Sequence, residues 1–188
     1  MKIELILKRL KTGNANFVND CLTNHLQDSV RRKSILNGQN PFAIILTCSD
    51  SRVVPELIFD TGLGELFVIR VAGNVANTSS IASIEYAVAH LDVQLIMVLG
   101  HQNCGAVTAA LAGVEKGNNI NHLFEFIQPA ISISNSIRAD DVSHIHANLT
   151  ADKLITESNI IAKAIEINAL QIIPAYYNLE TGQVDFFE

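Results

Sequence analysis

Three short and almost uninterrupted apolar runs constrain the fold of this chain more than any other feature. They are FAIILT at residues 42–47, LFVIRV at 66–71 and LIMVL at 95–99. A run of this length that is apolar on both faces is typical of a strand buried within a parallel sheet. Residues 171–177 and 184–187 add two strands around a turn, and Pro174 in the first of them favours an edge position or a local irregularity.

Helical patterns separate the predicted strands. Helices are expected up to about residue 19, over 81–91, over 103–111 and from about Thr150 to residue 169. Ser79 and Ser80 precede the second of these and are predicted to cap it. Alternating strands and helices indicate an α/β fold, with a mostly parallel sheet of about four to five strands flanked by helices. The length predicts a single domain over residues 1–188.

The composition excludes several classes of protein. The net charge is -6, from 13 basic and 19 acidic residues, so no basic field attracts nucleic acid or an anionic membrane. Charged residues make up 17%, against a usual value of about 25%, which indicates that much surface is hidden in a core or a subunit interface. No apolar run approaches the ~18 residues of a membrane span. The basic start lacks the apolar segment of a signal peptide, so we expect a cytoplasmic protein.

Two of the predicted strands end in residues that commonly bind metal ions. The first strand continues into Cys48, and the third runs through Gly100 into His101 and Cys104. Cysteine thiolates and histidine nitrogens suit zinc, and three or four of them make a tetrahedral site. Ligand sites in folds of this class gather at the carboxyl ends of the strands. Because both pieces stand at predicted strand ends, the pattern favours one metal site over separate core residues.

Asp50 and Arg52 form a second informative pair beside Cys48. They stand two apart in a short extended segment, so both side chains can point to the same side. A guanidinium can hold a carboxylate by two hydrogen bonds, but Asp50 is also close enough to Cys48 to reach a shared metal. Asp50 on the metal would close the site, whereas Asp50 on Arg52 would leave a position open for water, as in catalytic zinc sites. The residues themselves leave both arrangements open.

Two other groups receive a structural interpretation. His144 and His146 could bind a metal at alternating positions, but a polar surface loop is favoured. Cys21 has no neighbour at metal-binding spacing and is interpreted as a buried or idle thiol. With three cysteines in the chain, a disulfide scaffold is excluded.

Four segments together resemble the β-class carbonic anhydrases. They are CSDSRVVPE (48–56), RVAGNVAN (70–77), SIEYAV (83–88) and GHQNCGAV (100–107), and the similarity extends from GQNPF (38–42) to AYYNLETGQV (175–184). The resemblance covers nearly the whole chain with matching spacing. It implies the β-carbonic anhydrase fold. It also implies the zinc-dependent, reversible hydration of CO2 to bicarbonate and a proton, in which zinc-bound hydroxide attacks CO2.

The resemblance assigns roles to the residues at the strand ends. Cys48, His101 and Cys104 would be the protein ligands of one Zn2+ per subunit. Asp50 would be the fourth ligand or would form, with Arg52, a gate that acts in catalysis. No histidine is placed as an obvious proton shuttle.

The resemblance also implies a substrate pocket and an assembly. Gln39, Phe67 and Tyr86 match positions that line the pocket in relatives, partly across a dimer interface. The apolar side chains of Phe67 and Val71 would favour CO2 over charged competitors. The smallest functional unit of the family is a dimer, so we expect a homodimer or a dimer of dimers. An N-terminal helical arm over about residues 1–35 would pack on the partner subunit.

The chain departs from the family pattern at two places. The family commonly has Ser or Thr after the zinc histidine, and this chain has Gln102. Some members carry a regulatory bicarbonate site with a Trp three residues before the first zinc cysteine, where this chain has Ile45. Arg70 matches the basic residue of that site, which we expect to be absent or altered. A pH gate through Asp50 and Arg52 remains compatible with the sequence.

Two alternatives to CO2 hydration stay open at this point. The same zinc centre could hydrolyse carbonyl sulfide or carbon disulfide, and access to the pocket separates these substrates more than any motif does. Alternatively, the chain could be a catalytically silent, zinc-stabilised binding protein in which Asp50 is permanently on the metal.

Overall fold

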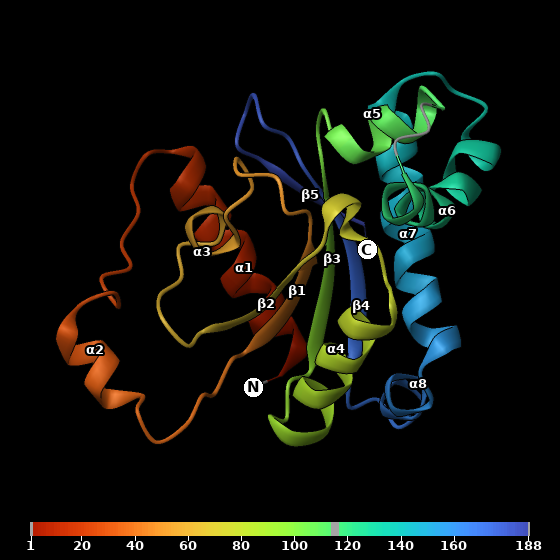
Figure 1. Ribbon diagram of the computed structural model, residues 1–188. Helices are drawn as coiled ribbons and strands as arrows, with labels where there is room; N and C mark the ends of the chain where they lie inside the picture. Colours follow the sequence, from red (N-terminus) through yellow and green to blue (C-terminus); the bar gives the residue numbers. More distant parts are fainter. Residues whose placement is uncertain (1, 114–116, 188) are drawn as a thin grey trace.

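The predicted strands form one sheet at the centre of the molecule (Figure 1). The computed structural model describes residues 2–113 and 117–187. Within them, the strands are β1 (Ala43–Thr47), β2 (Leu66–Arg70), β3 (Leu95–His101), β4 (Gln171–Tyr177) and β5 (Val184–Phe186). They lie in the order β2-β1-β3-β4-β5, parallel except for the antiparallel β4–β5 pair. The predicted α/β fold with a mostly parallel sheet is confirmed.

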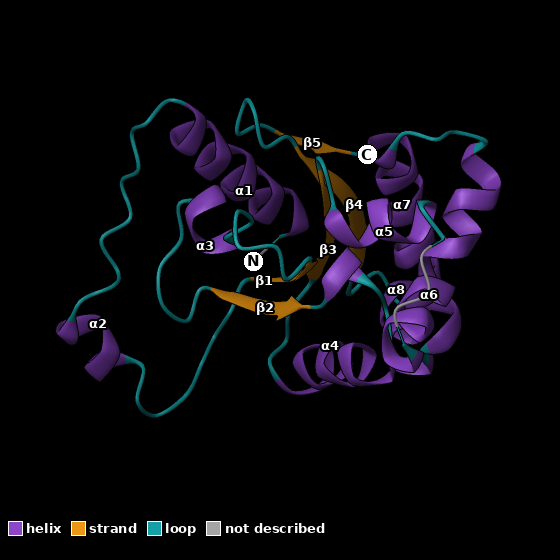
Figure 2. Cartoon of the chain, turned by 45° about the horizontal axis from the view of Figure 1, so that its top comes forward, coloured by secondary structure: helices purple, strands orange, loops and turns teal. Residues whose placement is uncertain are grey.

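Helices cover both faces of this sheet (Figure 2). One face carries α1 (Ile3–Val18) and α3 (Pro55–Ile58), and the other carries α4 (Thr78–His90), α7 (Ala139–Glu157) and α8 (Asn159–Glu166). The remaining helical elements are α2 (Ser29–Ser34), the 3-10 turn η1 (Ala72–Asn74), α5 (Gly105–Leu111) and α6 (Asn118–Ser134). Among the helices of the described residues, none is both long and apolar enough to cross a membrane.

β1 and β3 are apolar on both sides because both sides are covered, whereas β2, which was also predicted as a buried strand, lies at the edge of the sheet and is only partly buried. Ile45 packs into the core under α1, where Ile6 and Leu10 are 2% and 0% exposed. Its neighbour Ile44 packs with Ile84 of α4 into the core on the other face of the sheet. Each such side chain contributes about 1.5–3 kcal/mol when fully buried. This two-sided burial explains why the strand sequences are continuous apolar runs instead of alternating patterns.

Two helix boundaries differ from the sequence-based prediction. Asn77 caps α4 in place of Ser79 or Ser80: its side chain accepts the N–H of Ser80, and the Ser80 hydroxyl accepts the N–H of Asn77 in return. The single long helix predicted from about Thr150 is wrong, since two helices, α7 and α8, occupy this stretch. Ser158 separates them, because its extended backbone interrupts the helix and its hydroxyl accepts a backbone N–H of α8.

Pro174 lies on β4 between β3 and β5, so of the two alternatives predicted for it the edge position is wrong. It pairs with Val98 of β3 on one side, and on the other side its carbonyl accepts the N–H of Phe187. The proline nitrogen faces the same side as this carbonyl, at a point where β5 has already ended. A proline without an N–H is tolerated at this position because the β4–β5 ladder begins only at the next residue, so no hydrogen bond inside that ladder is lost.

The N-terminal segment packs partly on its own chain. Ile6 and Leu10 of α1 are buried in the core of the sheet, whereas the stretch around α2 projects from the body (Figure 1). Exposed apolar residues of this stretch are Leu22, Leu26, Val30 and Leu36. Packing of the arm over about residues 1–35 on a partner subunit stays a prediction, and this projecting stretch is its most exposed part.

Helices α1 and α3 approach each other closely at Gly13. A Cβ atom added to Gly13 would lie 1.9 Å from the carbonyl oxygen of Phe59, so the helices would have to separate. We predict that Gly13→Ala destabilises the protein by about 1–3 kcal/mol, although alanine favours a helix interior by about 1 kcal/mol. Urea unfolding measures the change. Gly38→Ala, which meets no atom within 4 Å, is the control, and equal stability of the two variants would contradict the prediction.

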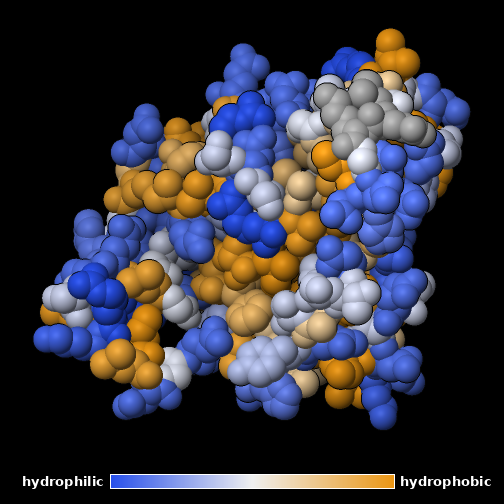
Figure 3. Space-filling view, in the orientation of Figure 1, coloured by the Kyte–Doolittle hydropathy of each residue, from blue (hydrophilic) through white to orange (hydrophobic). Residues whose placement is uncertain are grey.

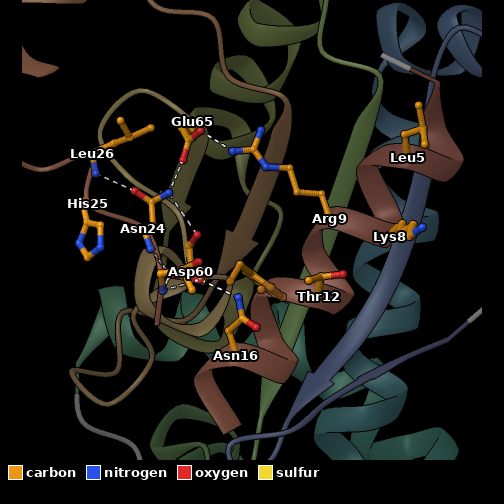
Figure 4. A pocket seen from close by; sticks show the side chains of 13 residues that line it. Leu5, Lys8, Arg9, Thr12, Asn16, Asn24, His25, Leu26, Asp60 and Glu65 are labelled. Carbon is orange, nitrogen blue, oxygen red and sulfur yellow. Dashed lines mark hydrogen bonds and ion pairs between the residues drawn. The ribbon is translucent and has the colours of Figure 1, made fainter. Parts of the chain in front are cut away.

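A polar network beside a surface pocket holds the start of the projecting stretch (Figure 4). The Asp60 carboxylate accepts hydrogen bonds from the backbone N–H groups of Thr23 and Asn24 and from the side chain of Asn16. Burial raises the pKa of Asp60, but these donors outweigh it and lower the pKa to about 2. The charged carboxylate therefore joins residues 23–24 to α1 and to the end of α3.

We predict that Asp60→Ala destabilises the protein by about 1–3 kcal/mol at neutral pH. Because the pKa of Asp60 is lower in the folded than in the unfolded chain, its contribution is complete above the unfolded value of about 3.9. It is lost as the pH falls through the folded value. Urea unfolding of both proteins from neutral to strongly acidic pH should show the difference shrinking below about pH 4. A difference that stays constant over this range would disprove the role of the charge.

Candidate metal centre

The carboxyl ends of β1 and β3 bring the predicted metal ligands together. Cys48 follows β1 directly, His101 is the last residue of β3, and Cys104 stands at the N-terminus of α5. Because β1 and β3 are paired neighbours, their ends meet at one edge of the sheet. The two sulfurs and a nitrogen of His101 lie within 4.8 Å of one another, and all three residues are buried. This group could hold a metal ion.

The two thiols share a strongly polarised environment. Their sulfur atoms lie 4.0 Å apart. A hydrogen bond from Cys104 lowers the pKa of Cys48, which also accepts the backbone N–H of Gly73 at 3.3 Å. The same hydrogen bond and burial raise the pKa of Cys104. The backbone N–H groups at the start of α5 lower this pKa, but they do not outweigh the other two effects. A metal ion held here would take the place of the shared proton, because cysteine sulfurs bind metals as thiolates.

His101 has the orientation of a metal-ligating histidine. Its Nδ1 lies 2.9 Å from the carbonyl oxygen of Gln102, which only accepts hydrogen bonds, so Nδ1 carries the proton. The lone pair of Nε2 is therefore free, and this atom is buried without a hydrogen-bond partner. A buried polar atom left in this way costs about 1–3 kcal/mol. A metal ion bound between this nitrogen and the two sulfurs accounts for the missing partner.

Asp50 is paired with Arg52 and does not belong to the three-residue group. Its Oδ1 accepts the Arg52 Nε at 2.9 Å, and its Oδ2 accepts Nη2 at 2.7 Å. The guanidinium also donates to the carbonyl oxygen of Asn103 at 3.3 Å, next to the metal ligands. The Arg52 side chain holds the pKa of Asp50 well below its usual range. Of the two arrangements that the residues leave open, the structure shows the pair with Arg52.

Two further side chains hold the loops that carry the ligands. Arg70 donates to the carbonyl oxygens of Cys48 and Asp50, at 3.3 and 2.6 Å, and so fixes the loop after β1. Gln102 accepts the backbone N–H of Glu180 through its side-chain oxygen at 3.2 Å, which ties the loop after β3 to the β4–β5 turn. That the regulatory bicarbonate site is absent or altered stays a prediction.

The residues predicted for the substrate pocket fall into two places. Val71 packs against the buried cluster that contains the two metal-ligand cysteines. Phe67 pairs in register with Ile44, four residues before the first ligand, which is about 13 Å along a strand. Tyr86 is 50% exposed, with its ring centroid 6.5 Å from that of Phe67, and Gln39 is exposed. Only Val71 is therefore placed beside the ligands of its own chain.

The interpretation of His144 and His146 as a surface loop is wrong. Both lie on α7, where the His144 ring stacks on Tyr176 with centroids 3.7 Å apart. His146 is 2% exposed, and its Nε2 lies 2.8 Å from the carbonyl oxygen of Gly73. The sequence pattern therefore did not reveal that His146 is buried and contacts Gly73, whose N–H donates to the Cys48 sulfur. Cys21 is exposed, so of the two interpretations given for it the buried one is wrong.

Comparison with known proteins places the chain in a family. Residues 43–184 match the family model described as carbonic anhydrase. A carbonic anhydrase of Mycolicibacterium smegmatis is 38% identical over 185 residues, covering 95% of this chain and 90% of the relative. Carbonic anhydrase 2 of Mycobacterium tuberculosis is 38% identical over 183 residues, covering 94% and 88%. In fold, the chain matches a tetrameric β-carbonic anhydrase of Sordaria macrospora with a TM-score of 0.77 at 22% identity, covering 98% and 97%. The chain therefore belongs to the β-class carbonic anhydrases.

Proposed function

We propose that the protein catalyses the reversible hydration of CO2 to bicarbonate and a proton on a zinc ion held by Cys48, His101 and Cys104. The observation that carries the proposal is the buried Nε2 of His101, which has no partner and stands in one group with two thiols. Two sulfurs about 2.3 Å from a tetrahedral zinc ion are ~3.8 Å apart. The observed 4.0 Å fits this donor set. Similarity to enzymes named carbonic anhydrase supports the reaction.

The side chains around the ligands have distinct tasks in this reaction. When bound, zinc supplies the Lewis acidity that makes a water in its fourth position able to attack CO2, as is established for carbonic anhydrases. Asp50, kept ionised by Arg52, accepts a hydrogen bond from the attacking water and orients it. Arg52 holds this carboxylate by two hydrogen bonds, and the apolar side chain of Val71 favours CO2 over charged competitors.

The pair of Asp50 and Arg52 supports an enzyme over a catalytically silent zinc protein. In a silent protein, the Asp50 carboxylate would close the site as a fourth ligand. Here both of its oxygens are engaged by the guanidinium. This pairing supports a metal site whose remaining position is open for water.

We also propose that the protein is a homo-oligomer in which a second copy covers the β2 edge. β2 is one of the two edge strands of the sheet, and Tyr86 beside it is 50% exposed. A band of apolar residues runs through the middle of this face, next to the projecting stretch (Figure 3). In such an assembly, Gln39, Phe67 and Tyr86 would line the pocket of the partner's metal centre. Light scattering of the purified protein would give a monomer mass if this proposal is wrong.

The reaction is tested by stopped-flow hydration of CO2 at mildly alkaline pH. We expect fast turnover by the zinc-loaded protein, loss of turnover on chelation and recovery when zinc is returned. Release of sulfide from carbonyl sulfide or carbon disulfide, measured on the same sample, tests the alternative substrates. Stoichiometric zinc without CO2 turnover would overturn the proposal.

A further inference from the structure

The Cys48 sulfur accepts a hydrogen bond from a backbone group outside the set of ligands. The donor is the N–H of Gly73, 3.3 Å away, in the 3-10 turn η1 that follows β2. A hydrogen bond to a metal-bound thiolate draws electron density from the sulfur and orients it. The position of the Gly73 peptide therefore affects how strongly Cys48 donates to a metal.

The turn that presents this N–H has a left-handed backbone at two positions. Gly73 has φ +68 and Asn74 has φ +46, so two consecutive residues are left-handed. A Cβ atom added to Gly73 would lie 3.1 Å from Ile127 Cδ1 and 3.3 Å from Ala106 Cβ. Position 73 therefore requires glycine, which is also the most flexible residue in the unfolded chain. Because glycine can adopt many backbone conformations, contacts with surrounding groups are needed to fix the direction of its N–H.

His146 supplies a restraint on the other side of Gly73. Its ring reaches from α7 to η1, where Nε2 lies 2.8 Å from the Gly73 carbonyl oxygen. The carbonyl only accepts, so Nε2 carries the proton and donates it. Burial lowers the pKa of His146, which keeps the ring neutral, and Nδ1 is buried without a partner. An apolar side chain would fill this space without leaving a nitrogen unpaired, so filling space does not by itself account for a histidine here.

We propose that His146 is a positioning residue of the metal centre, which acts through Gly73 on Cys48. The Nε2–H of His146 holds the carbonyl on one side of the Gly73 Cα and so restrains the φ and ψ of this glycine, whose N–H on the other side donates to the Cys48 sulfur. The inference rests on the proposed metal site and adds a residue that affects how tightly this site binds zinc.

Three variants separate this role from general packing of α7. His146→Leu keeps an apolar volume and removes the donor, whereas His146→Gln keeps an N–H near the place of Nε2. Ser143→Ala is the control, because Ser143 is also buried on α7 but its hydroxyl bonds to Ala139 of the same helix. Zinc affinity is measured by competition with a chromophoric chelator. The sulfur-to-metal charge-transfer band is measured on the Co2+-substituted protein.

We expect His146→Leu to weaken zinc binding by up to about 10-fold, the lower end of the range for direct partners of a ligand, because it acts through Gly73, and to move the charge-transfer band to lower energy. His146→Gln should restore both values most of the way, and Ser143→Ala should leave them unchanged. If the Leu and Gln variants change both readouts equally, or neither variant changes them, the hydrogen bond to Gly73 has no such role and the proposal is overturned.

A measurement on the unaltered protein decides the matter if His146→Leu does not fold. In 113Cd-loaded, 15N-labelled protein, a hydrogen bond to the metal-bound sulfur transmits a coupling between 113Cd and the amide proton of Gly73. We expect this coupling beside those to the β-protons of Cys48 and Cys104. Coupling to the cysteines without coupling to Gly73 would overturn the inference alone. Absence of coupling to either cysteine would overturn the proposed metal centre, and the inference with it.

Discussion

Cys104→Ala should leave a folded protein that holds no zinc and does not hydrate CO2. The change removes one of three protein donors, and Cys48 and His101 alone cannot complete a tetrahedral site. Activity should fall to the uncatalysed rate, a loss on the order of 10⁶-fold if the enzyme is at the lower end of natural accelerations. Elemental analysis of the purified protein and stopped-flow CO2 hydration measure the two effects.

The matched control for this variant is Cys21→Ala. Cys21 is the remaining cysteine, it is exposed, and it lies outside the metal-ligand group. Its loss should change neither zinc content nor turnover. Full zinc occupancy or normal activity in Cys104→Ala would show that the ligand assignment is wrong.

Asp50→Ala should keep zinc bound but lose most of the turnover. The carboxylate is outside the group of three ligands, so its removal leaves the metal donors in place. It removes the acceptor that orients the attacking water, and such positioned groups contribute about 10²–10⁴-fold to a rate. Zinc content and stopped-flow turnover, measured together, separate binding from catalysis.

The pH dependence of the Asp50–Arg52 pair follows from the sign of the pKa shift. Arg52 holds the pKa of Asp50 below its usual range, so the stabilising contribution of the pair is complete above the unfolded value of about 3.9. It is lost only as the pH falls through the lower, folded pKa. The defect of Asp50→Ala should therefore persist from mildly acidic to alkaline pH.

Asp141→Ala is the control for this second prediction. Asp141 belongs to an exposed ion pair with Arg138 at 3.7 Å, so a change limited to surface charge should leave turnover unchanged. Loss of zinc from Asp50→Ala would make Asp50 a ligand. Undiminished turnover with zinc bound would remove it from the mechanism.

The sheet and the meeting of Cys48, His101 and Cys104 could be predicted because their signals are local. Strands buried on both faces must be apolar throughout, and parallel neighbours bring the residues after β1 and β3 to one edge. Cys48, His101 and Cys104 therefore meet wherever these strands pair. The spacing suggested that Asp50 could pair with Arg52, but it did not decide between this pair and a place for Asp50 on the metal. Both arrangements are compatible with the same short segment after Cys48.

The features that the sequence did not predict depend on tertiary contacts, which a local sequence pattern does not contain. The contact of His146 with Gly73 joins α7 to η1, which is far away in sequence. The spacing of His144 and His146 alone therefore suggested a surface loop. The break between α7 and α8 at Ser158 was missed because apolar spacing continues across it, and only the hydroxyl cap marks the new helix. The edge position considered for Pro174 was wrong because sequence does not show that β4 lies between β3 and β5.

A crystal structure of the zinc-loaded protein at mildly alkaline pH, with an anomalous difference map at the zinc edge, tests the central claim most directly. We predict one zinc ion per chain, bound by the sulfurs of Cys48 and Cys104 and by Nε2 of His101. A non-protein ligand should occupy the fourth position, with Asp50 on Arg52. Zinc at another place, or Asp50 as the fourth ligand at this pH, would contradict the account of a metal centre that is open for catalysis.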